Sequence, residues 1–257
     1  LMYLGGIYAI AGLFVFALFM LGRNYFSSKK ENLEAQKEVD LRKAESKTIA
    51  GIIEESADNI SKTITRTNKI YSTTLRGLAK QELANLKKGR KGVDKLNNEI
   101  EDLRNNIFYF IKNLEESSVR ASNFYIQILD YLEDLTQSLD YISKSSYKHV
   151  NNNHKPLRFN QIRDLQEIDQ KLTEFLTESA KAFEDRNYLV IEQLLTQKES
   201  LYNSVTEKIQ KQVERTRSEE SSPKNTTLYF GLLLETKDLI EEIMNLLDLY
   251  ATEHTRA

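Results

Sequence analysis

The chain has 257 residues, which is enough for one large or two small domains. Its 36 basic and 38 acidic residues give a net charge of −2, so a general attraction to nucleic acid is not expected. The absence of cysteine excludes disulfide bonds and thiolate metal sites.

An uncharged apolar segment opens the sequence and covers residues 1–22. About 20 apolar residues cross the hydrocarbon core of a bilayer as a helix, so we expect a transmembrane helix within residues 1–26. The first charge is Arg23, and the positive-inside rule then places the remaining chain on the cytoplasmic side of an inner membrane. A signal peptide would need a basic start and a cleavage site, and a buried core helix would show a polar face. We expect the segment to be the last span of a longer protein.

Residues 27–47 are rich in Glu, Lys and Gln, which predicts a solvated helix that connects the span to the C-terminal part of the chain. Over residues 48–253 the apolar side chains recur three or four positions apart, and only 9 Gly and 2 Pro interrupt the whole chain. This part is therefore expected to be an all-α, long-helix antiparallel bundle.

The first bundle helix is expected to end at residues 88–92, where two glycines fall among basic residues. The surrounding KKGRKG stretch at residues 87–92 has two interpretations. It is either a solvated turn or a contact for phosphate or a lipid headgroup.

The most regular apolar spacing covers residues 93–142 and predicts one very long helix, or two helices joined near residues 117–118. A polar loop is expected at residues 149–156, because three Asn and one Pro follow one another closely there. Three further helices are expected after this loop. They cover residues 157 or 159 to 184, residues 187–213 with Asn187 as a cap, and residues 224–250 after a Ser222 cap.

Two pairs of carboxylates are spaced four residues apart on predicted helices. Glu54 and Asp58 lie in IIEESADNIS, and Asp130 and Asp134 lie in LDYLEDLTQS. Side chains four apart share a helix face, where like charges repel unless a cation bridges them. Such pairs therefore indicate either a site for a hard or borderline metal ion or an ordinary solvated face.

The histidines do not predict a site of their own. His149 and His154 share the polar loop, His254 is near the end, and loop histidines are usually solvated. No P-loop, dinucleotide-binding glycine motif, GxSxG or HExxH is present, and no acid–base pair indicates catalysis. We therefore do not expect an enzyme.

The two carboxylate segments resemble the repeated motif of the PhoU family, in which an acidic residue is followed four positions later by Asp. The stretches SYKHVNNNHKPL and LYFGLLLETKDLIEEIMNLLDLY also resemble the helical C-terminal tails of bacterial inorganic phosphate transporters. The resemblance implies a PhoU-like fold of two three-helix bundles, each with one motif, that regulates phosphate uptake. It also implies a divalent or iron metal ion, with Glu54 and Asp58 in one site and Asp130 and Asp134 in the other.

The leading functional expectation is a regulatory cytosolic domain of an inorganic phosphate transporter, with the membrane and the other transmembrane helices as partners. A homodimer is compatible with this expectation, and nucleic acid is not an expected partner. A chemoreceptor-like signalling coiled coil and a purely structural membrane tether are the alternatives. The long apolar stripe at residues 93–142 favours the coiled coil, whereas the helices after residue 157 favour a bundle.

Overall fold

The computed structural model describes residues 49–112, 119–218 and 222–256. These residues form six α-helices and one 3₁₀ turn, and no strand occurs among them. The elements are α3 (Ile49–Lys80), α4 (Leu83–Lys112), α5 (Val119–Asn151), α6 (Phe159–Glu184), η2 (Tyr188–Val190), α7 (Ile191–Arg217) and α8 (Pro223–Arg256). The expectation of an all-α bundle is confirmed for this part of the chain.

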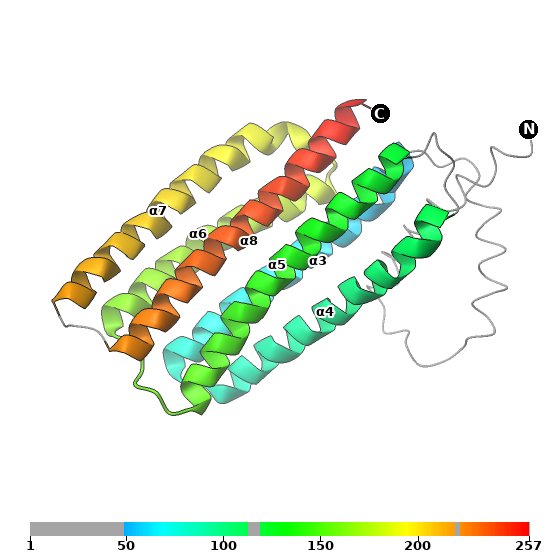
Figure 1. Ribbon diagram of the computed structural model, residues 1–257. Coiled ribbons are helices and arrows are strands. Elements are labelled where there is room, and N and C mark those ends of the chain that lie inside the picture. The colour runs from blue at the N-terminus through cyan, green and yellow to red at the C-terminus, as the bar shows by residue number, and fades with distance from the viewer. Residues whose placement is uncertain (1–48, 113–118, 219–221, 257) are drawn as a thin grey trace, which may run out of the picture.

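The helices form two groups of three that share one core. Helices α3, α4 and α5 pack against one another, as do α6, α7 and α8. The groups are joined where α3 meets α6 and where α8 meets α5 and α3 (Figure 1). Successive helices run in opposite directions, so α3, α5 and α7 end at the same end of the bundle at which α4, α6 and α8 begin.

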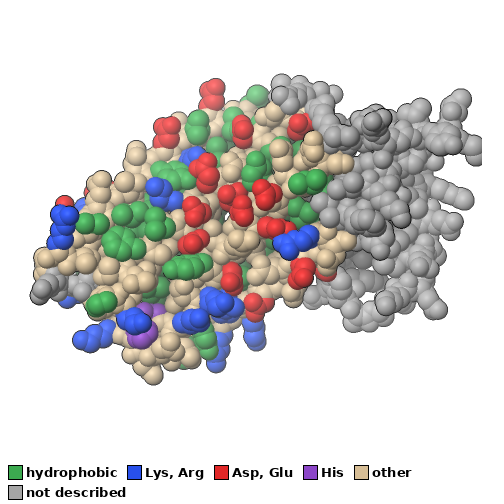
Figure 2. All heavy atoms as spheres, viewed as in Figure 1, with side chains coloured by type: hydrophobic (Ala, Val, Ile, Leu, Met, Phe, Trp, Pro, Cys, Tyr) green, Lys and Arg blue, Asp and Glu red, His purple; other side chains and the backbone are tan. Residues whose placement is uncertain are grey.

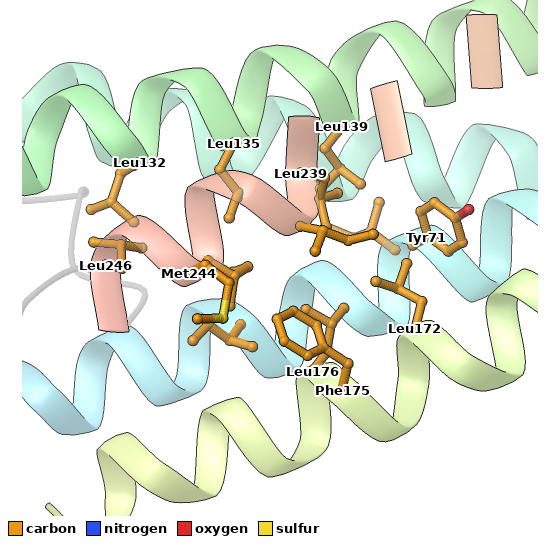
Figure 3. Packing of buried hydrophobic residues seen from close by; sticks show 14 of the residues in the cluster. Tyr71, Leu132, Leu135, Leu139, Leu172, Phe175, Leu176, Leu239, Met244 and Leu246 are labelled. Atoms are coloured by element: carbon orange, nitrogen blue, oxygen red, sulfur yellow. The ribbon is translucent and has the colours of Figure 1, made fainter. Parts of the chain in front are cut away.

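Long apolar side chains from both groups fill the space between them. In Figure 3, leucines of α5 such as Leu132, Leu135 and Leu139 lie opposite leucines of α8, with Phe175 of α6 close by. These side chains are almost completely buried, and their removal from water is the main force that holds amphipathic helices together. Most buried tyrosines keep a hydrogen bond, as the Tyr71 hydroxyl does with Thr236 Oγ1 at 2.8 Å, but the hydroxyl of buried Tyr188 has no partner among the described residues.

The predicted helix break at residues 88–92 is wrong, because α4 runs through it. The chain turns earlier, at Gln81, which has a positive φ of 57°. The two glycines instead allow α3 and α4 to approach closely. A Cβ atom on Gly89 would lie 2.5 Å from Thr74 Oγ1, and one on Gly92 would lie 2.9 Å from Ile70 Cγ1.

The predicted boundaries after residue 93 are mostly confirmed. The long stripe is two helices, since α4 ends at Lys112 and α5 begins at Val119; residues 117–118 lie outside the described residues. Helix α5 continues to Asn151, so the polar loop begins three residues later than expected. The Ser222 cap is confirmed, since Ser222 Oγ accepts a hydrogen bond from Asn225 N. Asn187 Oδ1 accepts one from Leu189 N and so caps the 3₁₀ turn η2, whereas α7 itself begins later, at Ile191, without a side-chain cap.

Within the described ranges, none of the helices is both long and apolar enough to cross a bilayer. The predicted span at residues 1–26 and the predicted connecting helix at residues 27–47 lie outside those ranges. Both therefore stay predictions.

Candidate functional site

The first predicted pair, Glu54 and Asp58, is partly neutralised by a single arginine of the second helix group. Both carboxylates lie on an exposed face of α3. Arg186, just after α6, reaches them with Nε 3.2 Å from Glu54 Oε1 and Nη1 2.5 Å from Asp58 Oδ1. The same guanidinium donates to the Glu54 carbonyl oxygen. This pair therefore joins α3 to the end of α6 without any cation from solution.

Arg186 occupies a position that usually favours glycine. Its φ is 51°, and Asn187 N donates to Ala182 O at 3.0 Å across it, which is the hydrogen bond of a helix-ending Schellman turn. A side chain in this left-handed conformation costs about 1 kcal/mol relative to glycine. The arginine is accommodated here by its ion pairs with α3.

The second predicted pair, Asp130 and Asp134, lies on α5 and meets a third carboxylate, Glu242 of α8. Burial, together with the charges of Asp134 and Asp130, raises the pKa of Glu242 to about 7, although a weak hydrogen bond from Asn245 acts to lower it. The pKa of Asp134 is also raised, by partial burial and then by the charges of Asp130 and Glu133. Asp130 and Asp134 themselves are exposed. We call Asp130, Asp134 and Glu242 the α5–α8 acidic cluster.

Acidic side chains are concentrated over the middle of the face that α5 and α8 form, as Figure 2 shows. The neighbouring carboxylate of Glu241 is already paired and does not belong to the cluster. Glu241, next to Glu242, accepts from Lys198 and from the Tyr202 hydroxyl, both at 2.7 Å. The cluster differs from Glu241 because the charges of Asp134 and Asp130 on α5 act, after burial, to raise the pKa of Glu242 on α8.

The two predicted pairs do not occupy one three-helix group each, as the resemblance implied. Helices α3 and α5 both belong to the first group, so Glu54, Asp58, Asp130 and Asp134 lie in the same half of the bundle. The second group contributes Glu242, which motif reasoning missed. The only sequence signal for it was its place in the tail-like segment, because the register between α5 and α8 cannot be read from spacing.

His149 and His154 lie at the end of α5, whereas His254 packs on Tyr188, which feels the charges of Glu54 and Asp58. His149 is buried and shares a hydrogen bond of 2.9 Å between Nε2 and the Lys155 carbonyl oxygen; burial lowers its pKa. The rings of His149 and His154 lie 5.2 Å apart, and that of His254 lies 5.5 Å from Tyr188. Across the described part of the chain, no group of three or more His, Asp or Glu is arranged to hold a metal ion.

Two hollows lie on the bundle surface, and neither contains the predicted carboxylates. The larger, of about 440 Å³, lies between α3 and α6 beside Thr65, Asn68 and Lys181. The smaller, of about 30 Å³, lies between α3 and α4 beside Arg66 and Glu99, which form an ion pair of 2.6 Å. Asp130 and Asp134 thus lie outside both hollows, on an exposed face of α5.

Comparisons with known proteins returned no matching family model, no matching curated protein and no matching solved structure.

Proposed function

We propose that this chain contains a regulatory helical domain of an inorganic phosphate transporter, similar to the PhoU family, which acts by binding a cation rather than by catalysis. The α5–α8 acidic cluster is the observation that carries the proposal. The link to phosphate rests on the motif and tail segments of the sequence. The domain would lie on the cytoplasmic side of the membrane, after the span expected at residues 1–26.

The chemistry of the cluster suits a hard or borderline divalent ion, or iron. Carboxylate oxygens are the ligands such ions prefer. Burial, and after it the negative charges of Asp134 and Asp130, raise the pKa of Glu242 and so oppose its ionisation. A cation would relieve this repulsion. Mg²⁺ and similar ions often keep several waters and use only one or two carboxylates, so a closed set of protein ligands is not required.

Cation binding at this place would act on the contact between the two helix groups. Asp130 and Asp134 belong to α5 of the first group, and Glu242 belongs to α8 of the second. Without a cation the like charges oppose this contact, and with one they favour it. The Glu54–Asp58 pair is a weaker candidate because both carboxylates already pair with Arg186, which offsets one of their two negative charges.

The experiment is a titration of the full 257-residue chain, purified in detergent, with Mn²⁺, Zn²⁺ or Fe²⁺ alone. Asp134→Asn and Glu242→Gln should each weaken binding about tenfold or more, because each removes one negative ligand. Asp58→Asn is the matched control and should leave affinity within about twofold of the wild-type value. Absence of binding, or equal loss in all three variants, would overturn the cation-binding proposal.

The proposed coupling to transport needs its own test. A flexible Gly-rich linker inserted within residues 27–47 of the complete transporter should leave phosphate uptake intact but remove its regulation, because the continuous helix expected there would be broken. Regulation that survives the insertion would contradict the coupling while leaving cation binding untouched.

A further inference from the structure

The end of the bundle farthest from Ile49 is rich in basic side chains. Residues 69–93 contain seven Lys and Arg against a single acidic residue, Glu82, and residues 141–163 contain five against none. The first range forms the end of α3 and the start of α4, and the second forms the end of α5 and the start of α6. The reversals between helices bring both ranges to the same end, where Figure 2 shows Lys and Arg near a histidine.

Two ion pairs fix how the basic residues of α4 and α5 lie relative to one another. Arg104 pairs with Glu133 and Arg90 pairs with Asp140, which shows that α4 and α5 are antiparallel. Lys87 lies about one turn before Arg90, and the next turn of α5 carries Lys144. The two lysines therefore occupy neighbouring positions on the outer side of the same helix pair.

Lys91 and Lys148 extend this group on the exposed faces of α4 and α5. Within the described residues, none of the four lysines forms an ion pair, whereas their neighbour Arg90 is held by Asp140 and Asp94. We define Lys87, Lys91, Lys144 and Lys148 as the lysine patch. Four ammonium groups on two adjacent helices repel one another unless an anion lies between them.

We propose that the lysine patch binds a soluble chain of phosphates, such as inorganic polyphosphate, whose closely spaced charges match several lysines at once. Lysine suits this ligand because its ammonium acts as a point charge toward phosphate oxygens. The proposal concerns a site separate from the acidic cluster and does not depend on cation binding there.

The position of the patch favours a soluble anion over a membrane surface. Helix α3 has 32 residues and is about 48 Å long at 1.5 Å per residue, and the patch lies at the end opposite Ile49, where the chain enters from residues 1–48. Duplex-binding proteins often neutralise six to ten phosphates, roughly twice the charge that four lysines supply. A short phosphate chain is therefore the better match.

The test is the fluorescence anisotropy of labelled linear polyphosphate, titrated with the full chain in neutral detergent at about 50 mM salt. A variant with Lys87, Lys91, Lys144 and Lys148 all changed to Gln should bind at least about tenfold more weakly, and wild-type affinity should fall steeply with salt. The control changes four lysines elsewhere to Gln, with the same loss of charge, and should retain affinity within about threefold. These control positions are Lys62, Lys171, Lys181 and Lys237.

Equal weakening in the patch and control variants would overturn the proposal, because it would show attraction to overall charge alone. Two further arms separate the sources of phosphate. Tighter binding of an oligonucleotide of equal charge would identify nucleic acid instead. Loss of polyphosphate binding when the chain is placed in anionic rather than neutral lipid nanodiscs would identify a lipid headgroup as the ligand. Circular dichroism of each variant establishes that its helices are intact.

Discussion

Substitution of Gly89 by Ala tests whether close contact between α3 and α4 explains the glycines in the middle of a helix. Gly89 has ordinary helical geometry, and Ala is more favourable than Gly in a helix interior by about 1 kcal/mol. Here, however, the new Cβ would lie 2.5 Å from Thr74 Oγ1 and 3.8 Å from Ser143 Oγ. Thr74 is fully buried, and its hydroxyl has no hydrogen-bond partner among the described residues, so it has little room to move.

The expected result is the difference between these two effects. Inserting a methyl group into a well-packed contact typically costs about 1 to 3 kcal/mol. We therefore expect Gly89→Ala to lower the free energy of unfolding by about 1 kcal/mol despite its better helix propensity. Thr74→Ala removes the obstructing oxygen, so Gly89→Ala in that background should stabilise, or at least no longer destabilise, the protein.

Gly231 provides a matched control on α8. Its added Cβ would lie 2.6 Å from Tyr141 Oη, but Tyr141 is 40% exposed and its ring can move into solvent. Gly231→Ala should therefore be neutral or stabilising by up to about 1 kcal/mol. The assay is chemical denaturation followed by the helical circular dichroism signal. Equal effects of the two Gly→Ala changes, or no rescue by Thr74→Ala, would refute the explanation.

Three further predictions concern ionic groups. Arg186→Gly should change the free energy of unfolding by no more than about 1 kcal/mol, because relief of the positive φ offsets the loss of partly exposed ion pairs. A denaturant titration that shows a loss of stability above about 2 kcal/mol would contradict this prediction. Glu242 binds its proton more tightly when folded, with a pKa of about 7 instead of 4.5, so stability should fall as pH rises from about 4.5 to 7 and then level off. Allowing for solvent screening, this fall in stability is of the order of 1 kcal/mol. Glu242→Gln should reduce the fall, as measured by thermal melts between about pH 5 and 8. A pH dependence of stability that the substitution leaves unchanged would count against the acidic cluster. Asp164→Asn should destabilise the protein by about 3 kcal/mol, because Arg215, 3.0 Å away, would lose its buried partner. Tyr229→Phe removes only one hydrogen bond to Asp164 and should cost about 1 kcal/mol in urea unfolding. Similar effects of the two substitutions would argue against a buried ion pair.

Helix identity and most helix ends could be predicted because they depend on local pattern. The Asn187 and Ser222 caps, for example, are recognisable from a few residues of sequence. The helix break at Gly89 and Gly92 was predicted wrongly for a reason that is not local. Glycine favours both turns and close helix contacts, and only the position of Thr74 on another helix shows which applies.

The carboxylate pairs show the same limit in the candidate site. Spacing along one helix brought Glu54 close to Asp58 and Asp130 close to Asp134, as expected. Their partners, however, come from distant segments: Arg186 lies 132 residues after Glu54, and Glu242, on the last helix, lies 112 residues after Asp130. Whether such a pair is neutralised or left with excess negative charge depends on helix packing, which a single sequence does not reveal.

Helix α3 packs against four of the other five α-helices described, namely α4, α5, α6 and α8, and it is the first described helix in the chain. A twist or pull delivered at its first turn would therefore reach both halves of the bundle at once, with no flexible joint in between. Helix α7, by contrast, packs against α6 and α8 at the periphery. A reporter fused at its outer surface would sense motion of the domain while disturbing it least.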